Sequence, residues 1–230
     1  MTMTMNTVKL SRKTFDILKN FATINANLYV TPGNTIKTLS SMKNIMAEAV
    51  VDETFDSEFG IWDMNKFLGT ISLFNNPDMV FGEKSVTISD TDASVCYHFS
   101  DPSLLLTPTK ELNMPEPVVE FSLTQKQFAE LQKASAVLQV PDICVRNEGD
   151  QLMLVVLDKS DIGSNSYSIN MGALPNDDHD FEFYFKVENL KILAGDYIVK
   201  ITEKIVSEFC HTGMDLKYWI AMESDSKYNA

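Results

Sequence analysis

Three short segments carry residue types that are used in nucleophilic catalysis. They are Ser40-Ser41-Met42-Lys43, Ser168-Ile169-Asn170 and His211-Thr212-Gly213. In serine acyl-transfer enzymes with an S-x-x-K motif, the serine begins a helix and its lysine lies one turn further on. Residues 40–43 are instead predicted to lead from a strand into a turn, and the second triplet follows too late. With no P-loop or G-x-S-x-G motif in the sequence, these segments do not predict an enzyme.

The residues that could ligate a metal do not predict a metal site or a bound cofactor. The acidic stretch Asn176–Asp180 lacks the spacing and the glycine of a calcium loop, so we interpret it as a solvated loop. The histidines are scattered along the chain (His98, His179 and His211). The cysteines are odd in number and form no C-x-x-C motif (Cys96, Cys144 and Cys210). We therefore expect buried thiols, without disulfides or zinc.

The distribution of charge is more informative. The chain of 230 residues has a formal net charge of −13, which argues against a simple nucleic-acid-binding protein. Residues 1–50, however, contain six Lys or Arg residues and two acidic residues, a net charge of +4, so the other 180 residues carry −17. This asymmetry predicts a basic region on an acidic body.

Several of these cations belong to a segment that is written twice. LSRKTFDILKNFATIN (residues 10–25) is followed 113 residues later by LTQKQFAELQKASAVL (residues 123–138). At 100° per residue, Phe15, Leu18 and Phe21 lie on one apolar face, and the matching face of the second segment contains Phe128 and Leu131. Five cations lie on the polar faces: Arg12, Lys13, Lys19, Lys126 and Lys133. The simpler interpretation, that lysines only solvate a surface helix, stays open.

A second pair of similar segments supports a duplicated fold. Residues 59–69 (FGIWDMNKFLG) resemble residues 183–193 (FYFKVENLKIL), and each is expected to contain a short helix. The segments between the helices alternate in polarity and predict antiparallel strands. We therefore predict an α+β fold of two similar domains, each an antiparallel sheet with two helices. The predicted boundaries are residues 1–108, an extended proline-containing connector at residues 109–117, and residues 118–230.

Polar faces of this kind can bind a polyanion without reading bases. Contacts of Lys and Arg with phosphate are independent of sequence and sensitive to salt. Because no aromatic residues alternate with the cations, we expect the backbone of a duplex as the ligand, with no stacking on single strands.

At these residues the chain resembles the sliding clamps of T-even-type bacteriophages, the processivity factors of the phage DNA polymerases. The resemblance is carried by residues 10–25, by WDMNKFLGTISL at residues 62–73 and by YWIAMESDS at residues 218–226. It runs in order from about Lys9 to the C-terminus. The sequence departs from the family in MTMTMNTV, which precedes the usual start, and in a more acidic second half.

The resemblance implies a homotrimeric ring with helices around a central hole through which duplex DNA passes. Arg12 and Lys19 match basic positions of the family's first helix, whereas Lys13 is a candidate only from its place on the helix. Further DNA-binding candidates are assigned by helix position alone: Lys66, Lys126, Lys133 and Lys191. The expected partners are double-stranded DNA, the DNA polymerase, an ATP-driven clamp loader and late-transcription factors.

The resemblance also implies a hydrophobic pocket near the connector that accepts C-terminal peptides of replication proteins. Candidate residues are Leu104, Leu105, Leu106 and Ile220, although core packing of the leucines remains an alternative. No apolar run approaches the roughly 20 residues of a membrane-spanning helix, and we expect the protein in the cytoplasm of the infected bacterial host. A phage structural or scaffold protein that does not thread DNA is the alternative function.

Overall fold

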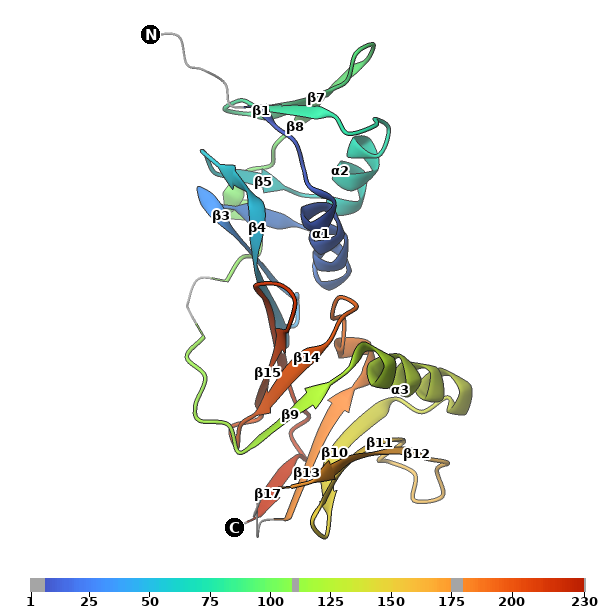
Figure 1. Ribbon diagram of the computed structural model, residues 1–230. Coiled ribbons are helices and arrows are strands. Elements are labelled where there is room, and N and C mark those ends of the chain that lie inside the picture. Colours follow the sequence, from blue (N-terminus) through green and yellow to red (C-terminus); the bar gives the residue numbers. More distant parts are fainter. Residues whose placement is uncertain (1–6, 109–111, 175–179, 230) are drawn as a thin grey trace. The chain divides into compact units, whose positions relative to one another are not determined.

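The computed structural model describes residues 7–108, 112–174 and 180–229, which fold into two compact units (Figure 1). Unit 1 comprises residues 1–111 and unit 2 residues 112–230. The division between them falls inside the connector predicted at residues 109–117. Most of the N-terminal extension, part of the connector and residues 176–179 of the acidic stretch lie outside the described residues.

The described part of unit 1 combines two α-helices with short antiparallel strands. Its helices are α1 (Arg12–Ile24) and α2 (Met64–Ile71), with a 3-10 turn, η1 (Pro102–Leu104), near its end. Its strands are β1 (Thr7–Val8), β2 (Leu28–Val30), β3 (Gly33–Leu39), β4 (Ile45–Phe55), β5 (Phe59–Ile61), β6 (Asp78–Phe81), β7 (Ser85–Ser89) and β8 (Ser94–His98). They pair as a sheet in the order β1-β6-β7-β8, a β3-β4 hairpin and a β2-β5 ladder.

The described part of unit 2 has one α-helix and more extensive sheets. The helix is α3 (Gln125–Leu138), and a 3-10 turn, η2, covers Val187–Asn189. The strands are β9 (Val119–Leu123), β10 (Asp142–Glu148), β11 (Gln151–Leu157), β12 (Tyr167–Ala173), β13 (Asp180–Lys186), β14 (Tyr197–Ile201), β15 (Val206–His211), β16 (Leu216–Ala221) and β17 (Lys227–Asn229). One sheet has the order β12-β11-β10-β13-β17, and β16, β15, β14 and β9 are neighbours in that order in another.

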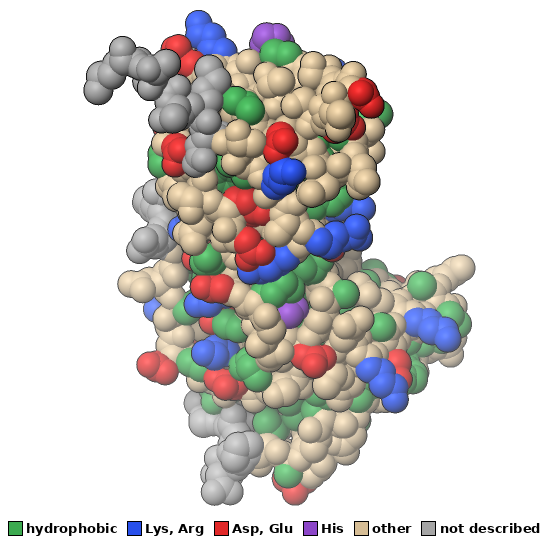
Figure 2. Space-filling model, turned by 45° about the horizontal axis from the view of Figure 1, so that its top comes forward, with side chains coloured by type: hydrophobic (Ala, Val, Ile, Leu, Met, Phe, Trp, Pro, Cys, Tyr) green, Lys and Arg blue, Asp and Glu red, His purple; other side chains and the backbone are tan. Residues whose placement is uncertain are grey.

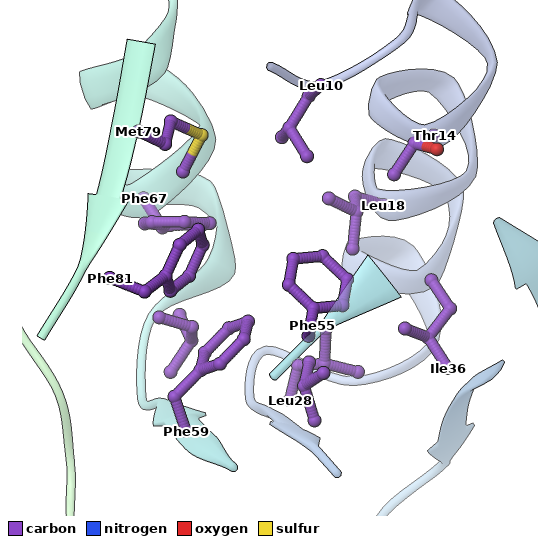
Figure 3. Close-up of a pocket in the computed structure, with 12 residues that line it drawn as sticks. Leu10, Thr14, Leu18, Leu28, Ile36, Phe55, Phe59, Phe67, Met79 and Phe81 are labelled. Atoms are coloured by element: carbon purple, nitrogen blue, oxygen red, sulfur yellow. The ribbon is translucent and has the colours of Figure 1, made fainter. Parts of the chain in front are cut away.

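Aromatic rings fill the core of unit 1, between α1 and the strands. Figure 3 shows Leu18 of α1 and Phe55 of β4 on one side, with Phe59, Phe81 and Met79 facing them. The ring centroids of Phe59 lie 5.3 Å from Phe55 and 4.9 Å from Phe81. The space left among the surrounding side chains is about 10 Å³, which is at the lower limit for one water molecule. This close packing fixes the face of α1 that is turned away from solvent.

The α+β class and the predicted strands are confirmed, but one predicted helix is wrong. The segment expected to form a second helix in unit 2 makes only η2, followed by an irregular chain to Tyr197. In unit 1 the carboxylate of Asp63 accepts the Lys66 backbone N–H at 2.9 Å and so caps α2. Lys186, at the corresponding place before η2, makes no such side-chain hydrogen bond. A side-chain cap satisfies one of the four N–H groups that have no partner within an α-helix, and the start of η2 lacks this stabilising contact.

Residues 112–117, the described part of the connector, form neither helix nor strand. Two smaller predictions differ from the structure. Phe15 is half-buried, whereas Leu18 and Phe21 are buried as predicted. Cys96 is exposed because burial alternates along β8 and Cys96 lies on its more exposed face, so the prediction of buried thiols fails there.

The motif at Ser40 is a turn, as predicted. The Ser40 hydroxyl accepts the backbone N–H groups of Asn44 and Ile45 at 3.2 and 3.0 Å, and Lys43 has a φ of 58°. The serine oxygen therefore stabilises the β3-β4 hairpin. None of the helices in the described residues is long and apolar enough to span a bilayer.

Candidate nucleic-acid interface

The first turn of α1 is fixed by a buried carboxylate from β4. Ser11 is the N-cap, and its hydroxyl accepts the Thr14 backbone N–H at 3.2 Å. Glu53, only 8% exposed, accepts hydrogen bonds from the Ser11 backbone N–H and the Thr14 hydroxyl. A negative charge at this end is favourable because the helix dipole is positive there. The start of α1, and with it Arg12, therefore has a defined position on unit 1.

Two candidate cations on α1 share one solvent-facing side. Arg12 and Lys19 are both exposed and are seven residues apart, which is two helical turns or roughly 10 Å along the axis. The Arg12 side chain is 83% exposed, and its Nε donates to Asp16 Oδ2 at 2.9 Å. The Lys19 Nζ lies 5.6 Å from the centre of the half-buried Phe15 ring. An aromatic ring thus lies beside a cation on this face, contrary to our expectation from the sequence.

Lys13 has a different environment from its neighbours on α1. Its Nζ lies 2.9 Å from Asp52 Oδ1 of β4, and its side chain is 35% exposed. Hydrogen bonds from Lys13 and then from Ser11 lower the pKa of the Asp52 carboxyl. Asp52 is far from Lys13 in sequence, so helix periodicity alone could not reveal this counter-ion. Lys13 is therefore held toward β4.

The second helix of unit 1 adds one more exposed cation. Lys66 lies in the first turn of α2, and its side chain is exposed. The two helices lie side by side in Figure 1 and contact each other. The Met64 backbone N–H donates to the Ala26 carbonyl at 2.7 Å, which ties the start of α2 to the chain just after α1. Unit 1 thereby brings Arg12, Lys19 and Lys66 onto two adjoining helices.

In unit 2, α3 carries a corresponding pair of exposed cations. Thr124 and Gln127 form a reciprocal capping box, and Asp196 Oδ1 accepts the Gln125 backbone N–H at 2.7 Å. The Lys126 side chain is 86% exposed, with Glu130 Oε1 at 3.9 Å from its Nζ. Lys133 is exposed seven residues later. As in α1, the helix start is anchored and the cations lie on the solvent side.

The two pairs do not occupy equivalent positions on their helices. With the 113-residue offset, Lys126 corresponds to Lys13 and Lys133 to Asn20. The exposed pair of α3 is therefore displaced by one residue, about 100° around the helix, from the Arg12 and Lys19 pair. Lysines that match in sequence, Lys13 and Lys126, thus have different environments.

The remaining predicted cation lies outside any helix. Lys191 is exposed two residues after η2, in the irregular chain that replaces the predicted helix. On the face drawn in Figure 2, Lys and Arg side chains lie among Asp and Glu side chains, without one continuous basic area.

Within residues 7–108, 112–174 and 180–229 no group of three or more His, Cys, Asp or Glu residues could hold a metal ion.

The candidate partner-binding residues lie in contrasting environments. Leu104 is 65% exposed, whereas Leu105 and Leu106 are half-buried. The Leu106 backbone N–H donates to Asn27 Oδ1 at 3.2 Å, and Leu105 Cδ1 lies close to Gly60 of β5. Ile220, on β16 of unit 2, is fully buried. The three leucines therefore form a short apolar segment docked on unit 1, and Ile220 exposes no side-chain surface.

A strand, a capped helix and antiparallel strands thus recur in both units, and the whole chain has the fold of DNA sliding clamps. It is similar to PCNA of A. fulgidus, solved with the C-terminal region of FEN-1 bound, with a TM-score of 0.70 and 12% identity. The match covers 96% of this chain and 99% of that one. By its architecture the chain therefore has the clamp fold.

Sequence comparison identifies the family within this class. Residues 120–224 match the family model described as gp45 sliding clamp, C terminal. The sliding clamp of Vibrio phage KVP40 is 31% identical over 223 residues, which covers 94% of this chain and all of that protein. The sliding clamp of Escherichia phage RB69 is 27% identical over 230 residues, covering 96% of this chain and all of that protein. The chain belongs to the phage sliding-clamp family, whose members are non-enzymatic processivity factors of DNA polymerase.

Proposed function

We propose that three copies of this chain close into a ring that encircles duplex DNA and tethers the replicative polymerase. The observation that supports this most directly is the pair of exposed cations, seven residues apart, on α1 and on α3. Each helix begins at a carboxylate-anchored N-terminus in its own unit. Paired cations on both repeated helices suit a ligand whose backbone charge repeats along its length.

The net charge is compatible with this ligand if the contacts are local. Three copies carry a formal charge of −39, three times −13. Screening over roughly 8 Å at physiological salt limits each charge to its surroundings. DNA would then be repelled by the acidic surfaces and attracted where the helix cations lie. Contacts that do not depend on the bases have nearly the same binding free energy at each position along the duplex. A closed ring can therefore slide.

We propose that the principal phosphate contacts come from five residues: Arg12, Lys19, Lys66, Lys126 and Lys133. Lys13 joins them by exchanging Asp52 for a phosphate, and Lys191 contributes from the chain after η2. Such contacts position a protein on DNA without conferring sequence specificity.

The ring also needs partners. We propose that an ATP-driven loader opens the ring. We also propose that the ring acts in the cytoplasm of the infected host and couples replication to late transcription.

The segment Leu104–Leu106 is proposed to bind C-terminal peptides of the polymerase and other replication proteins. The PCNA of A. fulgidus was solved with the C-terminal region of FEN-1 bound, which supports this mode. We assign buried Ile220 a supporting place beneath the surface of unit 2.

The first test is the mass in solution, measured by light scattering after size exclusion over a range of concentrations. We expect a species of about three times 25.9 kDa. A strict monomer at high concentration would contradict ring closure and favour a structural or scaffold role.

The second test separates the positions of the cations from net charge. The helix variant carries Arg12→Ala, Lys19→Ala, Lys126→Ala and Lys133→Ala. The control variant carries Lys84→Ala, Lys204→Ala, Lys217→Ala and Lys227→Ala. Both have a formal charge of −17, because each loses four cations from −13. Only the helix variant should lose polymerase stimulation on primed circular DNA and show a smaller salt slope, by about 0.9 per lost phosphate contact. Equal losses in both would show that position does not matter.

A further inference from the structure

We propose that a cleft in unit 1, beside the start of α1, binds one unpaired nucleotide of the DNA. The inference rests on the proposed function, since it adds a single-stranded ligand to a protein that we place around duplex DNA. The α1–α2 cleft, as we name it, lies between the first turn of α1 and the residues that follow α2. Its volume is about 350 Å³, within the range of small-molecule sites.

The floor of the α1–α2 cleft is apolar. Leu10 and Met79, both labelled in Figure 3, line this cleft as well as the small cavity of the core. Met79 and Ile71 are almost fully buried, so they close the cleft from below. A planar apolar group can therefore enter without contacting buried polar atoms that it would leave without a partner.

The walls supply two aromatic rings. Phe15 of α1 and Phe74, three residues after α2, line the cleft, and both are half-buried. Aromatic side chains that keep a face accessible are the surfaces on which unpaired bases stack. Stacking accepts every base, so it suits a protein that moves along DNA without reading its sequence.

The rim supplies the polar groups that a nucleotide requires. Asn75 and Asn76 line the cleft, and neither side chain has a hydrogen-bond partner within the described residues. Each amide offers a donor and an acceptor, as the edge of a base does. Arg12 lies at the same rim. A guanidinium has five N–H donors, and the hydrogen bond to Asp16 uses only Nε, which leaves donors for a phosphate.

The positive charge of Arg12, and its place in the exposed pair of cations on α1, favour DNA over a peptide as the occupant of the cleft. Arg12 is both the rim cation of the cleft and the first member of the exposed pair on α1. A strand whose phosphate contacts Arg12 therefore passes the mouth of the cleft. The backbone of an acidic peptide could also pair with the two amides, so the choice of DNA rests on the place of Arg12 in the exposed pair of α1 and on the two aromatic walls.

The test uses photo-crosslinking of a short oligo(dT) that contains one 5-iododeoxyuridine, with the crosslinked residue identified by mass spectrometry. This probe needs no ring closure or loading, so it reports on the cleft separately from the proposed function. We expect crosslinks at Phe15 or Phe74. In the variant Phe74→Leu with Asn75→Ala, affinity for the oligonucleotide should fall about fivefold or more, the loss expected for one stacked base. Lys84→Ala, on a turn away from the cleft, should crosslink like the wild type.

The outcomes separate the two proposals. Crosslinks confined to other residues, or an unchanged affinity in a double variant that melts at the wild-type temperature, would overturn the cleft site even where duplex binding persists. Protection of Phe15 and Phe74 by a polymerase C-terminal peptide, without crosslinking to DNA, would also overturn it and assign the cleft to a peptide. Crosslinks at the two rings without stimulation of a polymerase would keep the cleft site and reject the clamp function.

Discussion

Gly60 on β5 has no room for a side chain, which makes Gly60→Ala a sharp test of how the leucine segment docks on unit 1. A Cβ at this position would lie 2.5 Å from Leu105 Cδ1 and 2.7 Å from the Ser100 carbonyl oxygen. Ordinary contacts of such atoms are near 3.5 to 4 Å. Because the second neighbour is backbone, it cannot move away by rotating a side chain. Residues 100–105 must therefore shift, which also strains the 2.9 Å hydrogen bond from the Ser100 N–H to the Gly60 carbonyl.

The size of the effect follows from two opposing contributions. Overpacking typically destabilises a protein by about 1–3 kcal/mol, and displacement of backbone places this site near the upper end. The backbone of Gly60 is not in the left-handed region, so alanine itself adds no dihedral strain. Its lower chain entropy in the unfolded state offsets up to about 1 kcal/mol. We expect a net destabilisation of about 2 kcal/mol, which lowers the melting temperature by roughly 4–8 °C.

The matched control is the same substitution at Gly69 in α2, where an added Cβ would meet no atom within 4 Å. Alanine is the better helix former by about 0.5–1 kcal/mol, so Gly69→Ala should raise the melting temperature by about 1–4 °C. Thermal unfolding followed by circular dichroism measures both variants. If Gly60→Ala also raised the melting temperature, Leu105 would not be docked against β5, and its place in the partner-binding segment would need revision.

Three further predictions concern the capping, charge and thiols of the fold. Thr124→Ala removes the capping box of α3 and should destabilise the protein by about 1 kcal/mol, which a urea titration would detect. Lys186→Met leaves the fully buried Asp142 carboxylate without the Nζ that lies 2.6 Å from it, and the same titration should show a loss of about 3–5 kcal/mol. At pH 8, a thiol reagent should modify exposed Cys96 first. Cys144 should react only on unfolding, because burial raises the pKa of its thiol to about 12.

The repeated helices and their exposed cations could be predicted because both depend on local periodicity. Leu18, Phe21, Phe128 and Leu131 are buried, and Lys19 and Lys133 are exposed, as the helix period requires. Short alternating segments predicted the strands for the same reason. The turn at Ser40 was also a local property, since one hydroxyl accepts both N–H groups that the hairpin leaves free.

What the sequence could not predict depends on residues far apart in the chain. The partner of Lys13 is Asp52, 39 residues away, and the carboxylate at the start of α1 comes from Glu53. The segment after β13 has no side-chain cap at the start of η2, and apolar periodicity does not report whether such a hydrogen bond is present. The α1–α2 cleft brings Phe15 together with Phe74, which no motif links.

The carboxylates beside the helix cations bear on how a clamp could hold DNA and still move. Arg12 has Asp16 at 2.9 Å, and Lys126 has Glu130 at 3.9 Å. Exposed pairs of this kind contribute only about 0–1 kcal/mol, so a phosphate can replace the carboxylate with little change in free energy. The same exchange would make each phosphate contact weak, because the carboxylate would compete for the cation when the phosphate moves on. A surface of such exchangeable contacts would bind duplex DNA without preferring one position along it. Lasting attachment would then have to come from closure of the ring.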